Sequence, residues 1–265
     1  MNSRITGVEW INGDLCESSI WNRLPDEITH ICHLAAKIPW QEKDKQRASV
    51  VSENILPAAL LVENISRWHS LHGIVFSSSV SVYDSNSGFL SSCSKILPRD
   101  LYGASKLACE SILGTLSVRN IPVAVLRLSS LYGTGQYQGS VLPIMINRAI
   151  HGEIINVHGD GTRTQDFLYC DDAAMAVFLA CTKTVAGIFP LGSGTPTTMR
   201  QLAETVNEVF TGGRAKIIFS PEEEDGRPGI KVDITEARGV LGYDPKIQLE
   251  EGLRILKKHM EGVKK

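Results

Sequence analysis

The sequence predicts an α/β fold in which a doubly wound parallel sheet is followed by a smaller C-terminal lobe. In the first half, strand-like apolar runs alternate with segments of helical periodicity, which is typical of parallel strands joined by crossover helices. The second half is richer in helical segments and contains no repeat or long linker, so it should pack against the first. We therefore expect two interleaved domains, residues 1–130 and residues 131–265.

The first half contains four apolar runs that we expect to be strands: GVEWINGDL (7–15), THICHLAA (29–36), GIVFSSSVSVY (73–83) and IPVAVLRLS (121–129). Apolar residues recur at helical spacing over about residues 49–68, and a second helix is expected over about residues 102–119. The segment between them, residues 84–100, is rich in Ser, Asp and Pro and should be a loop. This β-α-β-α-β succession is the doubly wound pattern.

The second half contains four predicted helices and one predicted strand. The helices are LPIMINRAI (142–150), DDAAMAVFLACT (171–182), MRQLAETVNEVF (199–210) and the amphipathic EEGLRILKKHM (250–260). The acidic residues at the start of the second of these suit a helix N-terminus. The predicted strand is EIINVHG (153–159).

Composition argues against a nucleic-acid or membrane protein. Of the 265 residues, 43% are hydrophobic and 21% charged, and the net charge of −2 leaves no basic surface for nucleic acid or an anionic membrane. No apolar run approaches the ~20 residues of a membrane helix, and the N-terminus lacks the order of a signal peptide. We expect a cytoplasmic protein whose six cysteines are reduced. The seven histidines show no ligand spacing, so no metal site is expected.

Residues 101–110, LYGASKLACE, place Tyr102 and Lys106 four apart, on one face of a predicted helix. A lysine ammonium one turn away favours the ionised form of a tyrosine, so the pair could take a proton from a substrate hydroxyl. The same spacing also arises by chance in ordinary helices. The run FSSSVSVY strengthens the functional interpretation, because it ends a predicted strand where parallel α/β folds place their sites. There Ser79 could bond the same substrate oxygen, unless its hydroxyl only caps backbone groups.

The ordered motifs of nearly the whole chain resemble those of the extended short-chain dehydrogenase/reductases, the NAD-dependent epimerase/dehydratase group that acts on nucleotide sugars. The matching segments are NGDL (12–15), HLAA (33–36), Asn54, SSSVSVY (77–83), YGASK (102–106), LRLSSLYGTGQ (126–136), HGDGTRTQDFLYCDDAA (158–174), LGSG (191–194), GRPG (226–229) and LGYDP (241–245). The resemblance implies a Rossmann-like enzyme that uses NAD, with NADP also open. Its substrate would be a nucleotide sugar, and its reaction that of a 4-epimerase or related sugar oxidoreductase.

The resemblance also implies the residues of the site. The catalytic residues would be Ser79, Tyr102 and Lys106. The cofactor contacts would be Asp14, Leu15, Ala35, Ala36, Asn54, Ser77, Tyr102, Lys106 and Ser129. The substrate contacts would be Ser79, Ser130, Arg163 and Arg227. Dimers of the family use the helix that begins near Tyr102, so we expect a homodimer.

Departures from the family's motifs bear on the reaction and the substrate. Dehydrating members resemble this chain but carry Thr-Asp-Glu where it has Ser79-Val80-Ser81, and decarboxylating members use a Glu at the position of Ser81. Without a carboxylate there, both reactions are disfavoured, and chemistry at a single carbinol is favoured. Gln165 stands where the family has a phosphate-binding arginine, and Ser130 where it has a sugar-contacting asparagine. Both changes argue against the usual UDP-hexose.

No glycine-rich turn for a cofactor pyrophosphate precedes Asp14. In this family the sheet begins with a strand, a GxxGxxG turn and a helix, whereas this chain starts at what resembles the third strand. GTGQYQG (133–139) mimics the turn, but it follows the Tyr–Lys pair and already fits the family's YGxGQ loop. Residues 1–130 would thus form an incomplete dinucleotide-binding domain, and residues 131–265 mainly the substrate-binding lobe. A truncated enzyme, a catalytically inactive binding or structural relative, and an abbreviated nucleotide site remain open.

Overall fold

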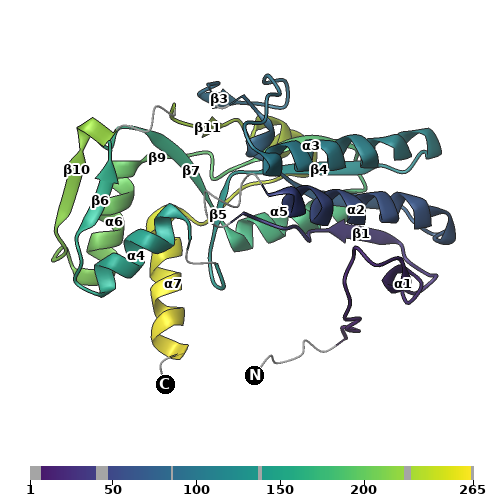
Figure 1. Ribbon diagram of the computed structural model, residues 1–265, viewed down its shortest axis with the longest axis horizontal. Coiled ribbons are helices and arrows are strands. Elements are labelled where there is room, and N and C mark those ends of the chain that lie inside the picture. Colours follow the sequence, from purple (N-terminus) through teal and green to yellow (C-terminus); the bar gives the residue numbers. More distant parts are fainter. Residues whose placement is uncertain (1–6, 40–46, 85, 137–138, 224–227, 264–265) are drawn as a thin grey trace.

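The structure, a computed structural model, describes residues 7–39, 47–84, 86–136, 139–223 and 228–263. Its centre is a four-stranded sheet with the order β1-β2-β4-β8 (Figure 1). Every pair of neighbouring strands in it is parallel. The strands are β1 (His30–His33), β2 (Gly73–Ser79), β4 (Val123–Leu128) and β8 (Gly187–Leu191). The predicted parallel α/β sheet is confirmed.

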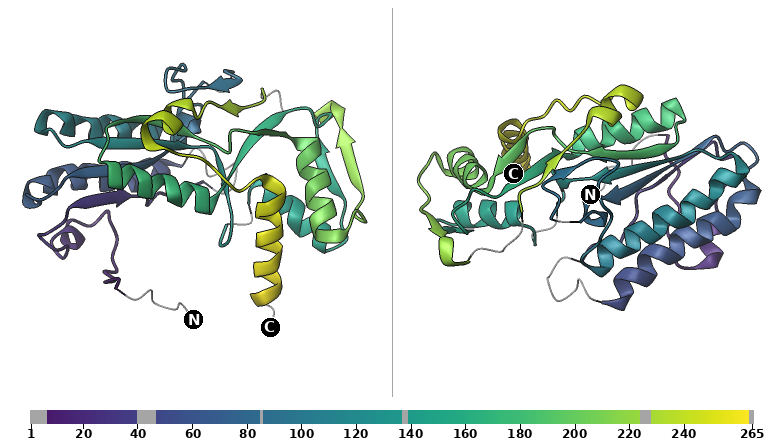
Figure 2. Two further views of the ribbon diagram at one scale, coloured as in Figure 1. Left: turned by 180° about the vertical axis from the view of Figure 1, so that it is seen from behind. Right: turned by 90° about the horizontal axis from the view of Figure 1, so that it is seen from above.

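Helices cover both faces of this sheet (Figure 2). On one face α2 (Ala48–Asn64) and α3 (Leu101–Gly114) lie side by side, and they continue into the short helices η2 (Ile65–Arg67) and η4 (Thr115–Arg119). On the other face α5 (Cys170–Lys183) packs a row of alanines against the strands. The expected crossover helices are confirmed. Such a sheet is buried on both faces, which is why β2 is apolar or small at every position.

One predicted strand is wrong. Residues 7–15 contain no strand, and the next helix, α1 (Ser18–Trp21), is a single turn. Trp10 is 54% exposed. A strand forms where a neighbour satisfies its backbone groups, and no described strand lies beside residues 7–15. β1 is accordingly an edge strand. Among the described residues it pairs with β2 alone.

The second half builds a separate core in which helices pack on one side of a parallel pair of strands (Figure 1). The predicted helices are confirmed as α4 (Val141–Ile150), α6 (Met199–Thr211) and α7 (Leu249–Val263), and the predicted strand as β6 (Ile155–His158), which pairs with β10 (Ile217–Ser220). Because α5 and β8 return to the main sheet, the two halves interleave. The boundary at residue 130 stays a prediction.

Short strands that were not predicted lie between the main sheet and the second lobe. β5 (Ser130–Tyr132), β7 (Thr164–Tyr169) and β9 (Pro196–Thr198) form a mixed three-stranded sheet. The expected loop 84–100 includes β3 (Phe89–Leu90), which pairs with β11 (Lys231–Val232). The remaining short helices are η3 (Val80–Val82), η5 (Pro221–Glu223) and η6 (Ala237–Leu241). In the described part of the chain, no helix is long and apolar enough to cross a membrane.

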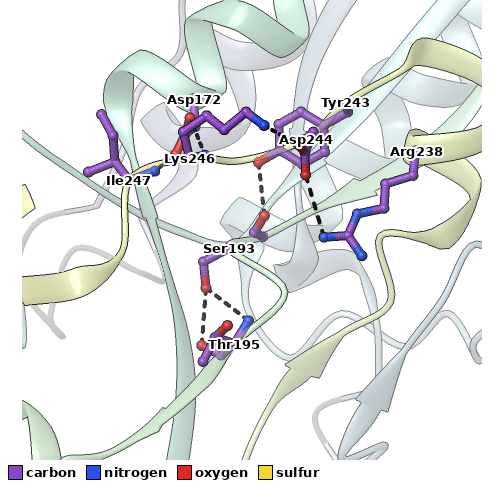
Figure 3. Close-up of polar contacts among 9 residues, drawn as sticks. Asp172, Ser193, Thr195, Arg238, Tyr243, Asp244, Lys246 and Ile247 are labelled. Carbon is purple, nitrogen blue, oxygen red and sulfur yellow. Dashed lines mark hydrogen bonds and ion pairs between the residues drawn. The ribbon is translucent and has the colours of Figure 1, made fainter. Parts of the chain in front are cut away.

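Residues 243–247 tie α7 to the main sheet (Figure 3). The Asp172 carboxylate, in the first turn of α5, accepts hydrogen bonds from the backbone nitrogens of Lys246 and Ile247 at 3.0 and 2.9 Å. The Tyr243 hydroxyl donates to the carbonyl of Gly192 just beyond β8, at 2.8 Å. These hydrogen bonds are buried or partly buried, so they fix the position at which α7, the last helix of the second lobe, begins.

Candidate active site

The first turn of α3 positions Tyr102 at the carboxyl end of β2. Asp100 caps the helix, and its Oδ1 accepts a hydrogen bond from the nitrogen of Gly103 at 2.8 Å. A Cβ atom at Gly103 would lie 2.3 Å from the carbonyl oxygen of Ser81, so only glycine permits this close approach of the helix to η3. The approach brings Tyr102 beside Ser79, whose hydroxyl lowers the pKa of the phenol.

Ser79 is held in one orientation by its neighbour Ser81. The Ser79 Oγ accepts from the Ser81 nitrogen and donates to the Ser81 Oγ, both at 3.1 Å. Ser79 thus caps the backbone of η3, and its bond to a substrate oxygen stays a prediction.

Lys106 follows Tyr102 by one turn of α3 and is 2% exposed. Its Nζ donates to the carbonyl oxygen of Ser77 at 2.6 Å and lies 5.9 Å from the centroid of the Tyr102 ring. Burial lowers the pKa of Lys106 to about 8. Near neutral pH its ammonium therefore remains charged and favours the ionised form of the tyrosine.

Burial raises the pKa of Tyr102 to about 12, although the hydrogen bond to Ser79 lowers it. The protein alone thus holds the phenol protonated at neutral pH. Acting as a base near pH 7 would require a strong further stabilisation of the phenolate. Additional positive charge beside the ring is the effect that can supply such stabilisation.

The loop after β1 is held against the site by Asn54 and Ser77. Asn54 Oδ1 accepts from the nitrogen of Lys37 at 2.6 Å, and its Nδ2 donates to the Lys37 carbonyl at 3.2 Å and to Ser105 Oγ at 2.9 Å. The Ser77 Oγ donates to the carbonyls of His33 and Leu34, both at 3.4 Å. Asn54 therefore joins this loop to Ser105 of α3, and its direct contact with a cofactor stays a prediction.

A cleft of about 660 Å³ opens beside Tyr102. It is lined by Ile38, Tyr102, residues 129–136, Ser140, Val141, Leu142, Gln165, Phe167 and Cys170. The predicted site residues Tyr102, Ser129 and Ser130 thus come together in one wall. No charged side chain belongs to the lining among the described residues.

Two polar atoms in the cleft wall have no hydrogen-bond partner among the described residues: Ser129 Oγ and Gln136 Oε1. The Gln136 Nε2 donates to the carbonyl of Leu131 at 3.1 Å and to Ser140 Oγ at 3.0 Å, so the amide oxygen can only face away from them. Buried polar groups normally have partners. Gln136 was not predicted as a site residue, although it belongs to the motif that ends LRLSSLYGTGQ.

Gln165 connects two of the predicted substrate residues and was also missed. Its Nε2 donates to Ser130 Oγ, and its Oε1 accepts from Arg163 Nη1 at 3.3 Å. Arg163 lies outside the cleft lining and instead borders a neighbouring cavity of about 320 Å³ with Arg148 and His158. The remaining predicted substrate residue, Arg227, lies outside the described residues.

The structure does not bring the other predicted cofactor residues into the cleft. Asp14 and Leu15 lie in the irregular segment before α1, where Asp14 Oδ1 accepts from the Cys16 nitrogen and the Leu15 carbonyl accepts from the indole of Trp21. Ala35 and Ala36 follow β1 and lie outside the lining. Their proposed contacts with a dinucleotide stay predictions.

The residues around Tyr102 fit the nicotinamide end of a dinucleotide. The unpartnered Ser129 hydroxyl in the cleft wall suits a carboxamide, and the buried Lys106 ammonium suits ribose hydroxyls beside the tyrosine. The pyrophosphate end is less complete. Of the described residues ahead of β1, only the single turn α1 is regular, so no strand-to-helix turn is formed there.

A parallel sheet with helices on both faces and a cleft at the carboxyl ends of its strands is a Rossmann-like fold. A model of the NAD dependent epimerase/dehydratase family matches residues 2–192. The chain belongs to this family, whose members are NAD-dependent enzymes.

Individual relatives agree with this assignment. The chain is 27% identical over 251 residues to a dTDP-glucose 4,6-dehydratase of Streptomyces niveus, covering 92% of this chain and 73% of the relative. A UDP-glucose 4-epimerase of Thermotoga maritima, solved with UDP-glucose, is 26% identical with a TM-score of 0.83, over 96% of this chain and 84% of that one. A UDP-glucuronic acid 4-epimerase of Bacillus cereus, solved with UDP-glucuronic acid and NAD, is 26% identical with a TM-score of 0.79, over 96% and 81%. The predicted family and fold are confirmed.

Proposed function

We propose that the chain is an NAD(P)-dependent nucleotide-sugar oxidoreductase of the 4-epimerase type. One observation carries the proposal: Tyr102 lines the cleft beside Ser79, with the Nζ of the buried Lys106 5.9 Å from the centroid of its ring. These are the groups needed to move one proton at a carbinol oxygen.

In this mechanism Tyr102 accepts the proton of the sugar hydroxyl and later returns it. Ser79 bonds the same oxygen and holds it in line with the phenol. Lys106 stays charged below a pKa of about 8 and stabilises the phenolate. When bound, an oxidised nicotinamide supplies the hydride acceptor and a further positive charge near the tyrosine.

The lining of the cleft favours epimerisation or oxidoreduction over elimination of water. Dehydration needs a general acid and a general base besides the tyrosine, and carboxyl groups usually serve. No Asp or Glu lines the cleft among the described residues, and Ser81 occupies the position where such a group would be expected. We therefore expect a reaction at a single carbinol and not the elimination carried out by dehydratase relatives.

The neighbouring cavity supports a phosphorylated substrate. Arg148, Arg163 and His158 border it, and it shares Val141 with the catalytic cleft. Arginine side chains bind phosphate well because their planar donors match its oxygens. A nucleotide sugar would place its sugar beside Tyr102 and its diphosphate toward these residues, with Arg227 as a further proposed contact.

We also propose a cytoplasmic homodimer. All six cysteines are free thiols, which suits a reducing compartment. The paired helices α2 and α3 lie on the outside of the molecule, and a second copy could pack against them (Figure 2). Light scattering at micromolar concentration tests this, and a monomer mass would contradict it.

Titration calorimetry with NAD and then NADP is the most informative test. We expect binding of one of them, followed by conversion of a nucleotide sugar that proton NMR detects. The absence of binding heat at millimolar concentrations of both cofactors would overturn catalysis by this chain. Binding of the nucleotide sugar without either cofactor would favour the alternative, a non-catalytic binding protein.

A further inference from the structure

Two cysteines from distant parts of the chain lie in contact. Cys32 belongs to β1 and Cys181 to the last turn of α5, and they are 149 residues apart in sequence. Their Sγ atoms are 3.1 Å apart. This separation is only about 1 Å longer than a disulfide bond.

The position of Cys32 in the edge strand leaves this pair accessible. Side chains alternate along a strand, so Cys32 faces α5 while Ile31 and His33 face the opposite side. There Ile31 packs in the core beneath α2 and α3, and the ring of His33 stacks on Phe76. Cys32 is exposed and Cys181 is half-buried, because β1 has no described neighbour on its outer side.

A second contact holds the same two segments in register. His30, two residues before Cys32 and on the same side of β1, has its Nε2 3.3 Å from the Oγ1 of Thr184. Thr184 lies just after α5. The two sulfur atoms are thus kept near each other by the backbone of both elements and by a neighbouring polar contact.

We propose that Cys32 and Cys181 are a thiol–disulfide exchange site that forms a reversible disulfide with a low-molecular-weight disulfide as oxidant. One thiolate attacks a sulfur of the small disulfide and releases one small thiol, which leaves a mixed disulfide on the protein. The other thiolate attacks the protein sulfur of that bond and releases the second small thiol. Two thiols of the protein are oxidised, one small disulfide is reduced, and two protons end on the released thiols.

The chemistry of the pair makes this exchange slow at neutral pH. Burial and the hydrogen bond with Cys181 raise the pKa of Cys32 to about 12. Because the thiolate is the nucleophile, the rate of exchange should rise as the pH increases from 7 to 9.

Two other cysteines, Cys93 and Cys109, have surroundings that differ from those of this pair. Cys93 is exposed and its Sγ contacts the Ser92 hydroxyl at 3.8 Å, so we expect it to form only a mixed disulfide. Cys109 is buried between α2 and α3 and donates its thiol hydrogen to the Asn54 carbonyl. Cys93 is therefore the matched control for an accessible thiol outside the pair.

The disulfide would fasten the edge strand that leads into the loop held by Asn54. It closes 149 residues of chain, which removes much conformational freedom from the unfolded state. In the chain-entropy model we expect the midpoint of thermal unfolding to rise by roughly 10 °C on oxidation.

The test is to incubate the full folded chain with oxidised glutathione at pH 8.5 and measure its intact mass, its disulfide-linked peptides and its thermal unfolding. We expect a loss of about 2 mass units at this pair, a linked Cys32–Cys181 peptide and a higher midpoint that dithiothreitol reverses. Cys93→Ser should give the same linked peptide and the same rise in the midpoint as the wild type, and should lack only the glutathione carried by Cys93. In Cys32→Ser and Cys181→Ser the remaining thiol should carry glutathione, and the midpoint should not rise.

Two outcomes would overturn the proposal. In one, Cys32 and Cys181 each end with a separate glutathione adduct, which would mean that the second exchange step does not occur. In the other, both thiols stay free after equilibration while Cys93 reacts. Neither outcome depends on catalytic activity, so this inference stands or falls independently of the proposed reaction.

Discussion

The side of the sheet that carries Tyr102 and the side that carries β1 differ in how completely they are packed. Around Tyr102, Lys106 is 2% exposed, Ser79 is 9% exposed, and both are hydrogen-bonded. Beside β1, Leu34 is 51% exposed, and on the nearby helix α5 Phe178 is 60% exposed. Parallel sheets are normally covered on both faces.

The difference in packing shows that the chain itself orders the surroundings of Tyr102 more completely than those of β1. The groups of the proposed proton transfer are held by contacts among α3, β2 and η3. The β1 side leaves apolar side chains such as Leu34 and Phe178 exposed to solvent.

Replacing Tyr102 by phenylalanine should abolish the proton transfer without disturbing the packing. We expect the turnover number for the nucleotide sugar to fall by roughly 10²- to 10⁴-fold, the usual contribution of a positioned acid–base group. The free energy of unfolding should change little, since only one hydroxyl is lost. Tyr169→Phe, in the second lobe, is the control and should retain activity. If Tyr102→Phe stayed within threefold of the wild type, another group would have to be the base.

Removing the Arg127 side chain should strongly lower the free energy of unfolding, because it pairs with Glu110 on the helix that carries Tyr102. Its side chain is 3% exposed, and its Nε and Nη2 donate to the Glu110 carboxylate of α3 at 3.0 and 2.6 Å. Arg127→Met leaves that carboxylate buried and unpaired, so we expect a loss of about 3–5 kcal/mol in the free energy of unfolding, measured with urea. Arg254→Met breaks the exposed pair with Glu250 and should cost less than about 1 kcal/mol. Equal losses in the two variants would contradict the contrast between buried and exposed pairs.

The stability of the β1 region should depend on the protonation of His33. Burial, with a smaller contribution from Lys106, lowers the pKa of His33 from 6.5 to about 4. Between these values the unfolded chain binds a proton that the folded chain does not, so stability should fall as the pH decreases from 6.5 to 4. The shift corresponds to a loss of about 3 kcal/mol.

Urea titrations at several pH values measure this dependence. His33→Gln should remove that part of the slope, whereas His69→Gln, at an exposed position, should leave it unchanged. An identical slope in His33→Gln and the wild type would assign the acid sensitivity to other groups.

Trimming an exposed ring on the β1 side should have the smallest effect. Phe178→Ala should change the free energy of unfolding by less than about 0.5 kcal/mol, because the ring contacts mostly solvent. Phe76→Ala is the matched comparison beneath Lys106, where the ring is 1% exposed, and should cost about 3–5 kcal/mol. A large loss in Phe178→Ala would show that the exposed face is covered in solution, and light scattering would then reveal the association.

Much of the fold could be predicted because local patterns decide it. Helical periodicity located α2 and α3, and the apolar run that ends in serines located β2. The strand predicted for residues 7–15 is absent, because an apolar alternating run becomes a strand only beside another strand. Short strands such as β5 and β9 were missed for the same reason, since their residues pair with partners far along the chain.

The candidate site divides in the same way. The spacing of Tyr102 and Lys106 on one helix, and the position of Ser79 at a strand end, could be predicted from the sequence. The contributions of Gln136 and Gln165 could not, because they depend on which hydrogen-bond partners the folded chain leaves unused or brings close. Arg163 likewise borders a second cavity, a placement set by how β7 packs between β5 and β9.

By itself, the sequence determined the class of fold and the family, since both rest on an ordered series of motifs along the chain, and it placed Tyr102 and Lys106 on one helix. Only the tertiary structure decided that burial raises the pKa of Tyr102 further above neutral pH. It alone also decided that β1 is an open edge and that Cys32 meets Cys181. The physical reason is that burial, strand pairing and contact between distant side chains come from long-range packing, which no local pattern of residues records.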